Sequence, residues 1–241
     1  MQIRRANTFF TIEQQFFQKA IKPTRHKATL TRYTHALKPS RKLSRQQTVH
    51  IKLSEDLHES LPSRTKKMLR RAEKEGYVVT QTTMPTIDQL NGFYDFYGAF
   101  AKMKNTIGIS IFNKKTLQLL LQQQAVLFSS VANTEGEILC YRIDIINGQS
   151  ALSYYVATWP YTLREDIKQQ VRYANRYLWW QNLLYLRENN YVLYDTGGLT
   201  NDVMIAQFKQ SFGGQVVDVY SGYVAHSTIG RMMLALKHWR E

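Results

Sequence analysis

A carboxylate and two glycines stand where an apolar run ends near the C-terminus. Asp195 follows the run 191–194, which reads as a short strand, and Gly197 and Gly198 come directly after Thr196. A carboxylate at a strand end beside two glycines can face a cleft that the turn opens. We therefore take Asp195, Gly197 and Gly198 as candidate site residues, although glycines here also suit an ordinary tight turn.

A lysine lies in the helical pattern that follows. Ile205, Phe208 and Phe212 recur at steps of three and four residues, which predicts one apolar helix face. Lys209 falls at the edge of that face rather than opposite it. Its stem can run along the core while its ammonium reaches the rim of a cleft, or it can extend to solvent.

Several other chemistries are disfavoured by the residues present. The sequence Asp195-Thr196-Gly197 matches the aspartic-protease signature, but that chemistry needs two carboxylates that share a proton, and one copy occurs, followed by Gly198. A protease would have to be a dimer. There is no Gly-x-Ser-x-Gly or phosphate-loop lysine motif, and the six histidines lack ligand spacing, so we expect no bound metal. The lone Cys140 lies in an apolar run and is expected to be a buried thiol.

The order of predicted elements from residue 77 is β-α-α-β-β-β-α-β-α-β-α. Thr86 and Gln89 form a capping box at the start of one helix, and Asn147-Gly148 is a strong hairpin signal between two strands. Ile167, Val171, Ala174 and Leu178 give a later long helix its buried face. We predict an α/β (α+β) fold with an antiparallel meander in a mixed sheet and helices on both faces.

Positive charge is concentrated at the N-terminal end of the chain. Of the formal net charge of +14 over 241 residues, residues 1–52 carry +11, with twelve Lys/Arg against Glu13. Such a segment attracts polyanions or keeps the protein in solution. We expect a basic extension over residues 1–53 and one domain over 54–241. The apolar runs are too short for a membrane span or a signal peptide, so we expect no transmembrane segment and a cytoplasmic location.

Segments of the C-terminal third resemble the FemAB-like branch of the GNAT acyltransferase superfamily. They are Tyr194-Asp195-Thr196-Gly197-Gly198 and Phe208-Lys209-Gln210-Ser211-Phe212-Gly213-Gly214. The earlier Arg70-Arg71-Ala72-Glu73-Lys74 followed by Gly76 supports the resemblance, which covers residues 54–224. The sequence departs from the family in having room for one GNAT-like domain rather than two, and in lacking the Gly-rich pyrophosphate loop of ordinary acetyl-CoA users.

The resemblance implies roles for particular residues. Lys209 would lie near the acyl donor and stabilise an oxyanion, and Asp195 would orient the amine or act as its base. Substrate-binding positions would be Phe208 and Asn175. Tyr155 and Trp159 would border the donor cleft, or would pack in the core and at its rim. Arg164 and Arg172 could meet phosphates or form a solvated helix face.

Two classes of function remain open on the sequence. The first is an N-acyltransferase or aminoacyltransferase for cell-envelope biogenesis, with acyl-CoA or aminoacyl-tRNA as co-substrate and no bound cofactor. Its acceptor would be a small-molecule or lipid-linked amine, such as an amine of an envelope precursor or amino sugar, and tRNA would be a partner if it supplies the acyl group. The second is a non-catalytic GNAT-like module that binds a polyanion.

Overall fold

The computed structural model describes residues 1–6, 10–18, 28–53, 56–159 and 165–240, and only the backbone at residues 165, 166 and 237–240. The chain forms two compact units, unit 1 (Met1–Thr48 and Val216–Glu241) and unit 2 (Val49–Gln215). The sequence analysis placed a division at residue 53, whereas contacts divide the chain at residues 48 and 215, and the C-terminal segment joins the N-terminal strands. Within the described residues, no helix combines the length and the apolarity that crossing a bilayer requires.

Unit 2 contains the predicted meander. Strands β6, β7 and β8 are consecutive antiparallel neighbours, β5 pairs with β6, and β9 runs parallel to β8. The last residues of β4 pair with β9. The tight hairpin predicted at Asn147-Gly148 is present, with Asn147 opposite Ser150. The strands are β4 (Ser44–Lys52), β5 (Val78–Thr82), β6 (Val126–Ala132), β7 (Ile138–Asn147), β8 (Ser150–Thr158) and β9 (Leu193–Asp195).

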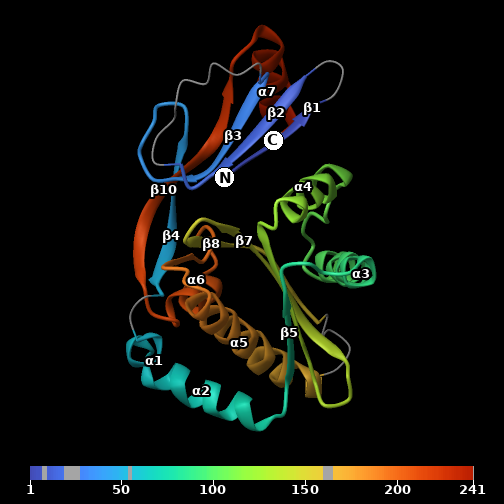
Figure 1. The fold of residues 1–241 in the computed structure, drawn as a ribbon, viewed down its shortest axis with the longest axis vertical. Coiled ribbons are helices and arrows are strands. Elements are labelled where there is room, and N and C mark those ends of the chain that lie inside the picture. The colour runs from blue at the N-terminus through green and yellow to red at the C-terminus, as the bar shows by residue number, and fades with distance from the viewer. Residues whose placement is uncertain (7–9, 19–27, 54–55, 160–164, 241) are drawn as a thin grey trace. The chain divides into compact units, whose positions relative to one another are not determined.

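Helices cover both faces of this sheet (Figure 1). Alternation along β7 separates the two faces: Cys140 contacts the backbone of the long helix α5, whereas Tyr141 packs against Phe93 and Phe96 of α3. Helix α2 packs along α5. The helices are α1 (Leu57–Ser60), α2 (Ser63–Lys74), α3 (Ile87–Met103), α4 (Ile111–Gln122), α5 (Glu165–Glu188) and α6 (Val203–Gln210).

Local signals explain where several helices begin. The capping box at Thr86 is confirmed, because the Thr86 hydroxyl accepts from the backbone of Gln89 and the Gln89 side chain accepts from the backbone of Thr86. The stretch before Gly76 holds two helices: α1 ends at Ser60, and Pro62 is the N-cap of α2. Proline is tolerated at the start of a helix but breaks its interior. Thr162 and Glu165 have the spacing of a second capping box, but Thr162 lies outside the described residues.

Trp179 of α5 is the centre of the core that fixes the C-terminal elements. Its ring is buried, with its centroid 4.6 Å from that of Phe212, 5.1 Å from Phe208 and 6.0 Å from Tyr194. Truncating a buried aromatic side chain typically costs about 3–5 kcal/mol. This packing joins α5, α6 and β9, and therefore holds the turn after β9 against the C-terminal end of α6.

Unit 1 is a small sheet with one helix. Strand β1 is antiparallel to β2, β2 is parallel to β3, and β3 is antiparallel to β10. Residues expected to form an extension thus contribute ordered strands. A core of Tyr33, Ala36, Leu43 and Val224 lies within this unit. Its elements are β1 (Gln2–Ala6), β2 (Thr11–Phe16), β3 (Leu30–Ala36), β10 (Gln215–Ala225, of which unit 1 holds all but the first residue) and α7 (Thr228–Arg240).

Candidate functional site

The turn after β9 is built around the carboxylate of Asp195. Asp195 is fully buried, and its Oδ1 accepts a hydrogen bond from the backbone of Gly197 at 2.9 Å. Its Oδ2 lies 3.3 Å from Nε2 of His50, the residue directly opposite on β4. Gly197 has φ +74°, and a Cβ there would lie 3.0 Å from the carbonyl oxygen of Ser153. Glycine is therefore required both by the left-handed backbone and by the close approach of β8.

Lys209 reaches this turn from α6. The helix is capped by Asp202, whose side chain accepts from the backbone of Met204 and Ile205. From the last turn of α6, the Nζ of Lys209 donates to the carbonyl oxygen of Gly197 at 2.9 Å and to that of Gly198 at 2.7 Å. The ammonium is thus held at the turn by two backbone carbonyls.

The surroundings of Lys209 lower the pKa of its ammonium group. Burial, followed by the positive charge of Arg142, lowers the pKa of Lys209 to about 8, while the carboxylate of Asp195 acts in the opposite direction. Burial disfavours the charged form of a lysine because the ammonium loses its hydration. A pKa close to neutrality is characteristic of groups at functional sites, although structural networks also produce it.

A buried charged network lies beneath the turn on the α5 face of the sheet. The Arg142 guanidinium stacks on Trp179, with its Cζ 4.2 Å from the ring centroid, and donates to Asn175 at 3.3 Å and Ser153 at 3.2 Å. Because Arg142 is almost completely buried, these contacts fix its direction. It links α5 to the strand that contacts Gly197.

A carboxylate on the same strand completes the network. Asp144 accepts from the Tyr194 hydroxyl at 2.8 Å and from the Asn182 amide at 2.9 Å. Burial raises the pKa of Asp144, against the opposing effects of Arg142 and these two hydrogen bonds. Its oxygens are directed into the core, so we assign Asp144 to support of the site.

A cavity of about 340 Å³ opens beside α6. We call it the arginine groove, because Arg64, Arg172 and Arg176 contribute to its wall and, among the described residues, no acidic side chain does. Arg176 donates to the Ser211 hydroxyl at 2.6 Å, and its Cζ lies 4.9 Å from the Phe208 ring centroid. The groove lies between α2, α5 and α6 and is lined by Arg64, Thr65, Met68, Arg172, Asn175, Arg176, Met204, Gln207, Phe208 and Ser211.

The electrostatics of the arginine groove favour an anion. Burial, followed by the positive charge of Arg64, lowers the pKa of Arg176 to about 10. At neutral pH the guanidinium remains charged. Two close cations without a carboxylate partner repel one another, and a bound phosphate or carboxylate removes that cost.

The structure brings together most of the residues singled out from the sequence. Asp195, Gly197, Gly198 and Lys209 meet at one turn. Of the proposed binding residues, Arg172, Asn175 and Phe208 line the arginine groove. Asn175 also touches Arg142, so it connects the groove with the network beneath the turn.

Two predicted residues lie elsewhere in unit 2. Tyr155 packs in the aromatic layer under α3, with its ring centroid 5.5 Å from that of Tyr97, and Trp159 packs 6.0 Å from Phe96. Tyr155 lies on the face of the sheet opposite α5, whereas Trp159, just after the end of β8, also packs against the core cluster that includes Val171 of α5. Arg164 falls outside the described residues.

The sequence analysis missed His50 and Arg142. No local pattern around His50 indicates its partner, because that contact depends on the pairing of β4 with β9. Arg142 carried a weak signal: it is a charged residue within the apolar run Ile138–Ile146. Among the described residues, no group of three His, Cys, Asp or Glu side chains could hold a metal ion.

The element order, the meander and the helix-covered faces define the class of fold. The chain has the mixed α/β fold expected from its sequence, and it shares this fold with solved structures of FemX and of a putative lysylphosphatidylglycerol synthetase. It is similar to the crystal structure of FemX, with a TM-score of 0.65, 12% sequence identity and coverage of 98% of this chain and 85% of that chain. No family model matches the sequence, and no curated protein matches it.

Two further solved structures share the fold. The C-terminal domain of a putative lysylphosphatidylglycerol synthetase from Agrobacterium fabrum has a TM-score of 0.56 at 11% identity, with coverage of 86% of this chain and 71% of that one. L-PGS from Bacillus licheniformis has a TM-score of 0.54 at 12% identity, with coverage of 87% and 72%. Similarity at such low identity establishes the fold alone, and the chemistry of this chain has to be argued from its own residues.

Proposed function

We propose that the chain is a FemAB-like acyl- or aminoacyltransferase that forms an amide on an amine. The nitrogen of a neutral amine attacks the carbonyl carbon of an acyl-CoA thioester or an aminoacyl-tRNA ester. A C–N bond forms, the C–S or C–O bond breaks, and the proton lost by the amine is delivered to the leaving sulfur or oxygen. Such a reaction needs alignment of the reactants, a proton acceptor and stabilisation of the negative oxygen.

The single observation that carries this proposal is the position of Lys209. An ammonium has three N–H groups, and among the described contacts two of them are directed to Gly197 and Gly198. We assign the third to the oxygen of the tetrahedral intermediate. A donor that is already oriented needs little reorganisation when charge develops, and this is why preorganised donors are effective in catalysis.

The pair of His50 and Asp195 supplies a route for the proton. The imidazole lies 3.3 Å from a fully buried carboxylate and is itself partly exposed, with 15% of its side-chain surface accessible. A carboxylate that holds one imidazole nitrogen orients the ring and stabilises its protonated form. We therefore propose that His50 receives the amine proton, directly or through water, and that Asp195 positions it.

The arginine groove is proposed to hold the phosphates of the donor. Both donors carry phosphates, at the far end of the pantetheine arm in acyl-CoA and on the terminal nucleotides in aminoacyl-tRNA. Guanidinium groups bind phosphate oxygens with two parallel hydrogen bonds. For the acceptor we propose an amine of a cell-envelope precursor or an amino sugar. This proposal is supported by the similarity to FemX, to the putative lysylphosphatidylglycerol synthetase and to L-PGS.

The test is transfer by the purified full chain. The protein is incubated with one of two donors, a set of acyl-CoAs or a mixture of charged tRNAs, and with amino-sugar and peptide amines as acceptors. Acceptor-dependent loss of donor, together with a product whose mass has increased by the acyl group, is the expected result. Saturable donor binding without any acceptor-dependent product would instead favour the alternative, a non-catalytic module whose arginine groove binds a polyanion.

A further inference from the structure

Unit 1, which contains none of the residues assigned to the proposed function, has a strongly basic surface. Fourteen lysines and arginines against three acids give unit 1 a formal charge of +11, although it contains less than a third of the chain. Two of the acids are already engaged or hidden. Glu13 is buried, and Asp218 pairs with Arg45 at 2.9 Å. The remaining surface therefore attracts anions.

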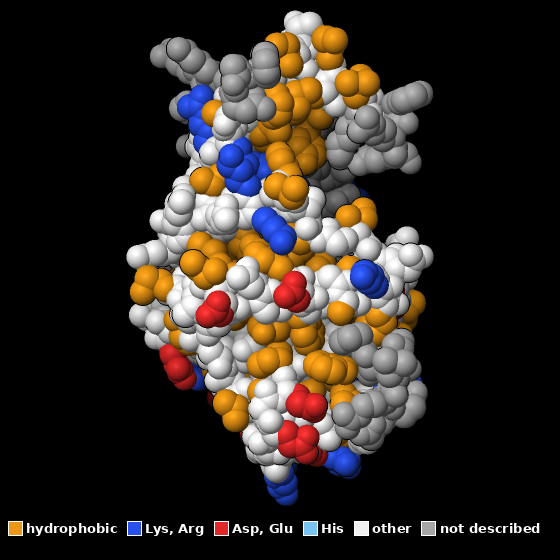
Figure 2. Space-filling view, turned by 90° about the vertical axis from the view of Figure 1, so that its right-hand side faces the viewer, with side chains coloured by type: hydrophobic (Ala, Val, Ile, Leu, Met, Phe, Trp, Pro, Cys, Tyr) orange, Lys and Arg blue, Asp and Glu red, His pale blue; other side chains and the backbone are white. Residues whose placement is uncertain are grey.

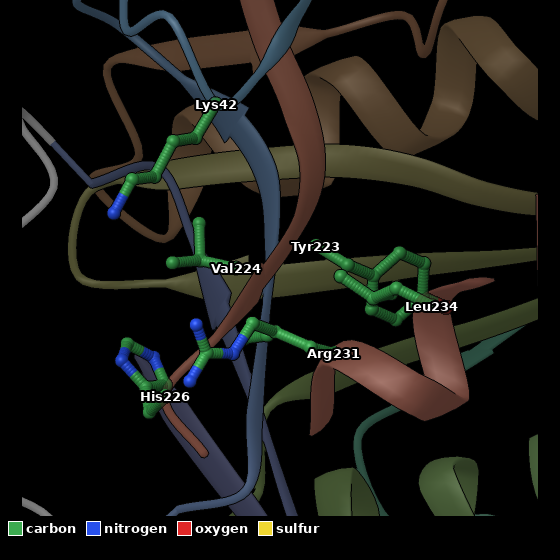
Figure 3. A pocket seen from close by; sticks show the side chains of 7 residues that line it. Lys42, Tyr223, Val224, His226, Arg231 and Leu234 are labelled. Atoms are coloured by element: carbon green, nitrogen blue, oxygen red, sulfur yellow. The ribbon is translucent and has the colours of Figure 1, made fainter. Parts of the chain in front are cut away.

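A cavity of about 490 Å³ in this unit gathers three of its basic side chains. Figure 3 shows Lys42, Arg231 and His226 around Val224. His226 is held by the Thr31 hydroxyl at 2.9 Å from its Nε2. Within the described part of unit 1, no acidic residue contributes to the lining, which consists of Lys42, Tyr223, Val224, Ala225, His226, Arg231 and Leu234.

The helix that contributes Arg231 to this cavity also exposes an apolar stripe. Helix α7 packs on the sheet through Gly230, because a Cβ at that position would collide with the carbonyl oxygen of Thr29. The side chains of Ile229, Met232 and Leu236 are 52%, 63% and 61% exposed. Their spacing of three and four residues places them on one side of the helix, turned away from Gly230. In Figure 2, hydrophobic side chains gather on the upper part of the surface, with lysine and arginine side chains beside them.

We propose that unit 1 docks on an anionic phospholipid surface through α7 and the neighbouring cationic cavity. In this arrangement the α7 stripe enters the boundary between headgroups and acyl chains, and the cavity receives a lipid phosphate. The combination favours a membrane over a nucleic acid, because a polynucleotide needs the cations but gives no reason to leave three large apolar side chains exposed. Amphipathic helices with basic neighbours bind membranes by burial of apolar surface plus attraction to anionic headgroups. The inference does not depend on acyl transfer.

The test is co-sedimentation of the full chain with phosphatidylcholine vesicles that contain or lack phosphatidylglycerol. We expect binding only with the anionic lipid and weakening by salt. Lys42→Gln together with Arg231→Gln should weaken binding about 25-fold, since each cation near such a surface contributes about fivefold. Met232→Gln with Leu236→Gln should weaken it at least about tenfold by removing buried apolar surface.

Matched controls come from unit 2. Ile107→Gln with Ile111→Gln removes two apolar side chains that are 86% and 87% exposed, and Lys67→Gln with Arg70→Gln removes two cations of α2. Both pairs should leave vesicle binding unchanged. The proposal is overturned if the α2 pair abolishes binding while the unit 1 pairs do not. It is equally overturned if the α7 apolar pair has no effect and tRNA displaces the protein from the vesicles, which would identify a nucleic-acid surface.

Discussion

Gly197→Ala tests whether the turn after β9 has to keep its shape for transfer. At φ +74° an L-residue costs roughly 1–2 kcal/mol relative to glycine. The added Cβ would also lie 3.0 Å from the Ser153 carbonyl oxygen, so the turn or β8 must shift. Overpacking of this kind costs about 1–3 kcal/mol more. We expect the melting temperature to fall by about 4–20 °C, at about 2–4 °C per kcal/mol for a chain of this size.

Gly136→Ala is the matched control. Gly136 has φ +83°, but nothing lies within 4 Å of a Cβ built there. Gly136→Ala has the same free-energy cost of placing an L-residue at positive φ, and it changes the unfolded chain in the same way as Gly197→Ala. Because it adds no steric clash, it should lower the melting temperature by only about 2–8 °C. Transfer should be unchanged in Gly136→Ala.

The clearest difference between Gly197→Ala and Gly136→Ala should be in the rate of transfer. The carbonyl groups that hold Lys209 belong to Gly197 and Gly198, so a shifted turn misplaces the ammonium. A displacement approaching 1 Å can cost about 100-fold in rate, and we expect at least a tenfold loss in Gly197→Ala. The measurements are differential scanning fluorimetry and transfer under saturating donor. Equal melting temperatures and equal rates in the two variants would refute the reasoning.

Two further predictions concern the groups on either side of the turn. Asp195→Asn should lower the rate of transfer. It should also move the alkaline fall of the pH–rate profile to lower pH, because the Asp195 carboxylate raises the pKa of Lys209. A fall that stays near pH 8 would contradict this effect of Asp195 on Lys209. Arg176→Gln should weaken donor binding and reduce the slope of its salt dependence by about one unit, as measured by fluorescence titration. The control Arg187→Gln, at an exposed position near the end of the same helix, should change neither quantity, and equal effects of the two variants would argue against the arginine groove.

Much of the fold was predictable because it depends on local periodicity. The meander follows from three strand-like runs in close succession and from the Asn147-Gly148 turn, where Asn147 pairs with Ser150. The apolar face of α5 follows from Ile167, Val171 and Ala174, all of which are buried. These signals lie within short stretches of sequence, so they can be recognised without knowledge of tertiary contacts.

The parts that could not be predicted depend on pairing between distant segments. His50 and Asp195 are 145 residues apart in sequence and meet only because β4 lies beside β9. The association of β10 with β3 has the same character, and it is why a basic N-terminal segment becomes part of a sheet rather than an extension. The burial of Arg142 likewise depends on Trp179, which lies on another element.

The central claim is that the Lys209 ammonium stabilises the oxyanion of an acyl transfer, and Lys209→Met tests it most directly. The substitution keeps most of the stem and deletes the charge, whereas Lys209→Arg keeps a cation. The measurement is single-turnover acyl transfer with saturating donor across the pH range around 8. We predict a loss of about 100- to 1000-fold in Lys209→Met. We also predict that the wild-type rate falls as pH rises through about 8, where Lys209 loses its proton. Any activity that Lys209→Arg retains should not fall at that pH. Near-wild-type turnover by a folded Lys209→Met protein would contradict the claim.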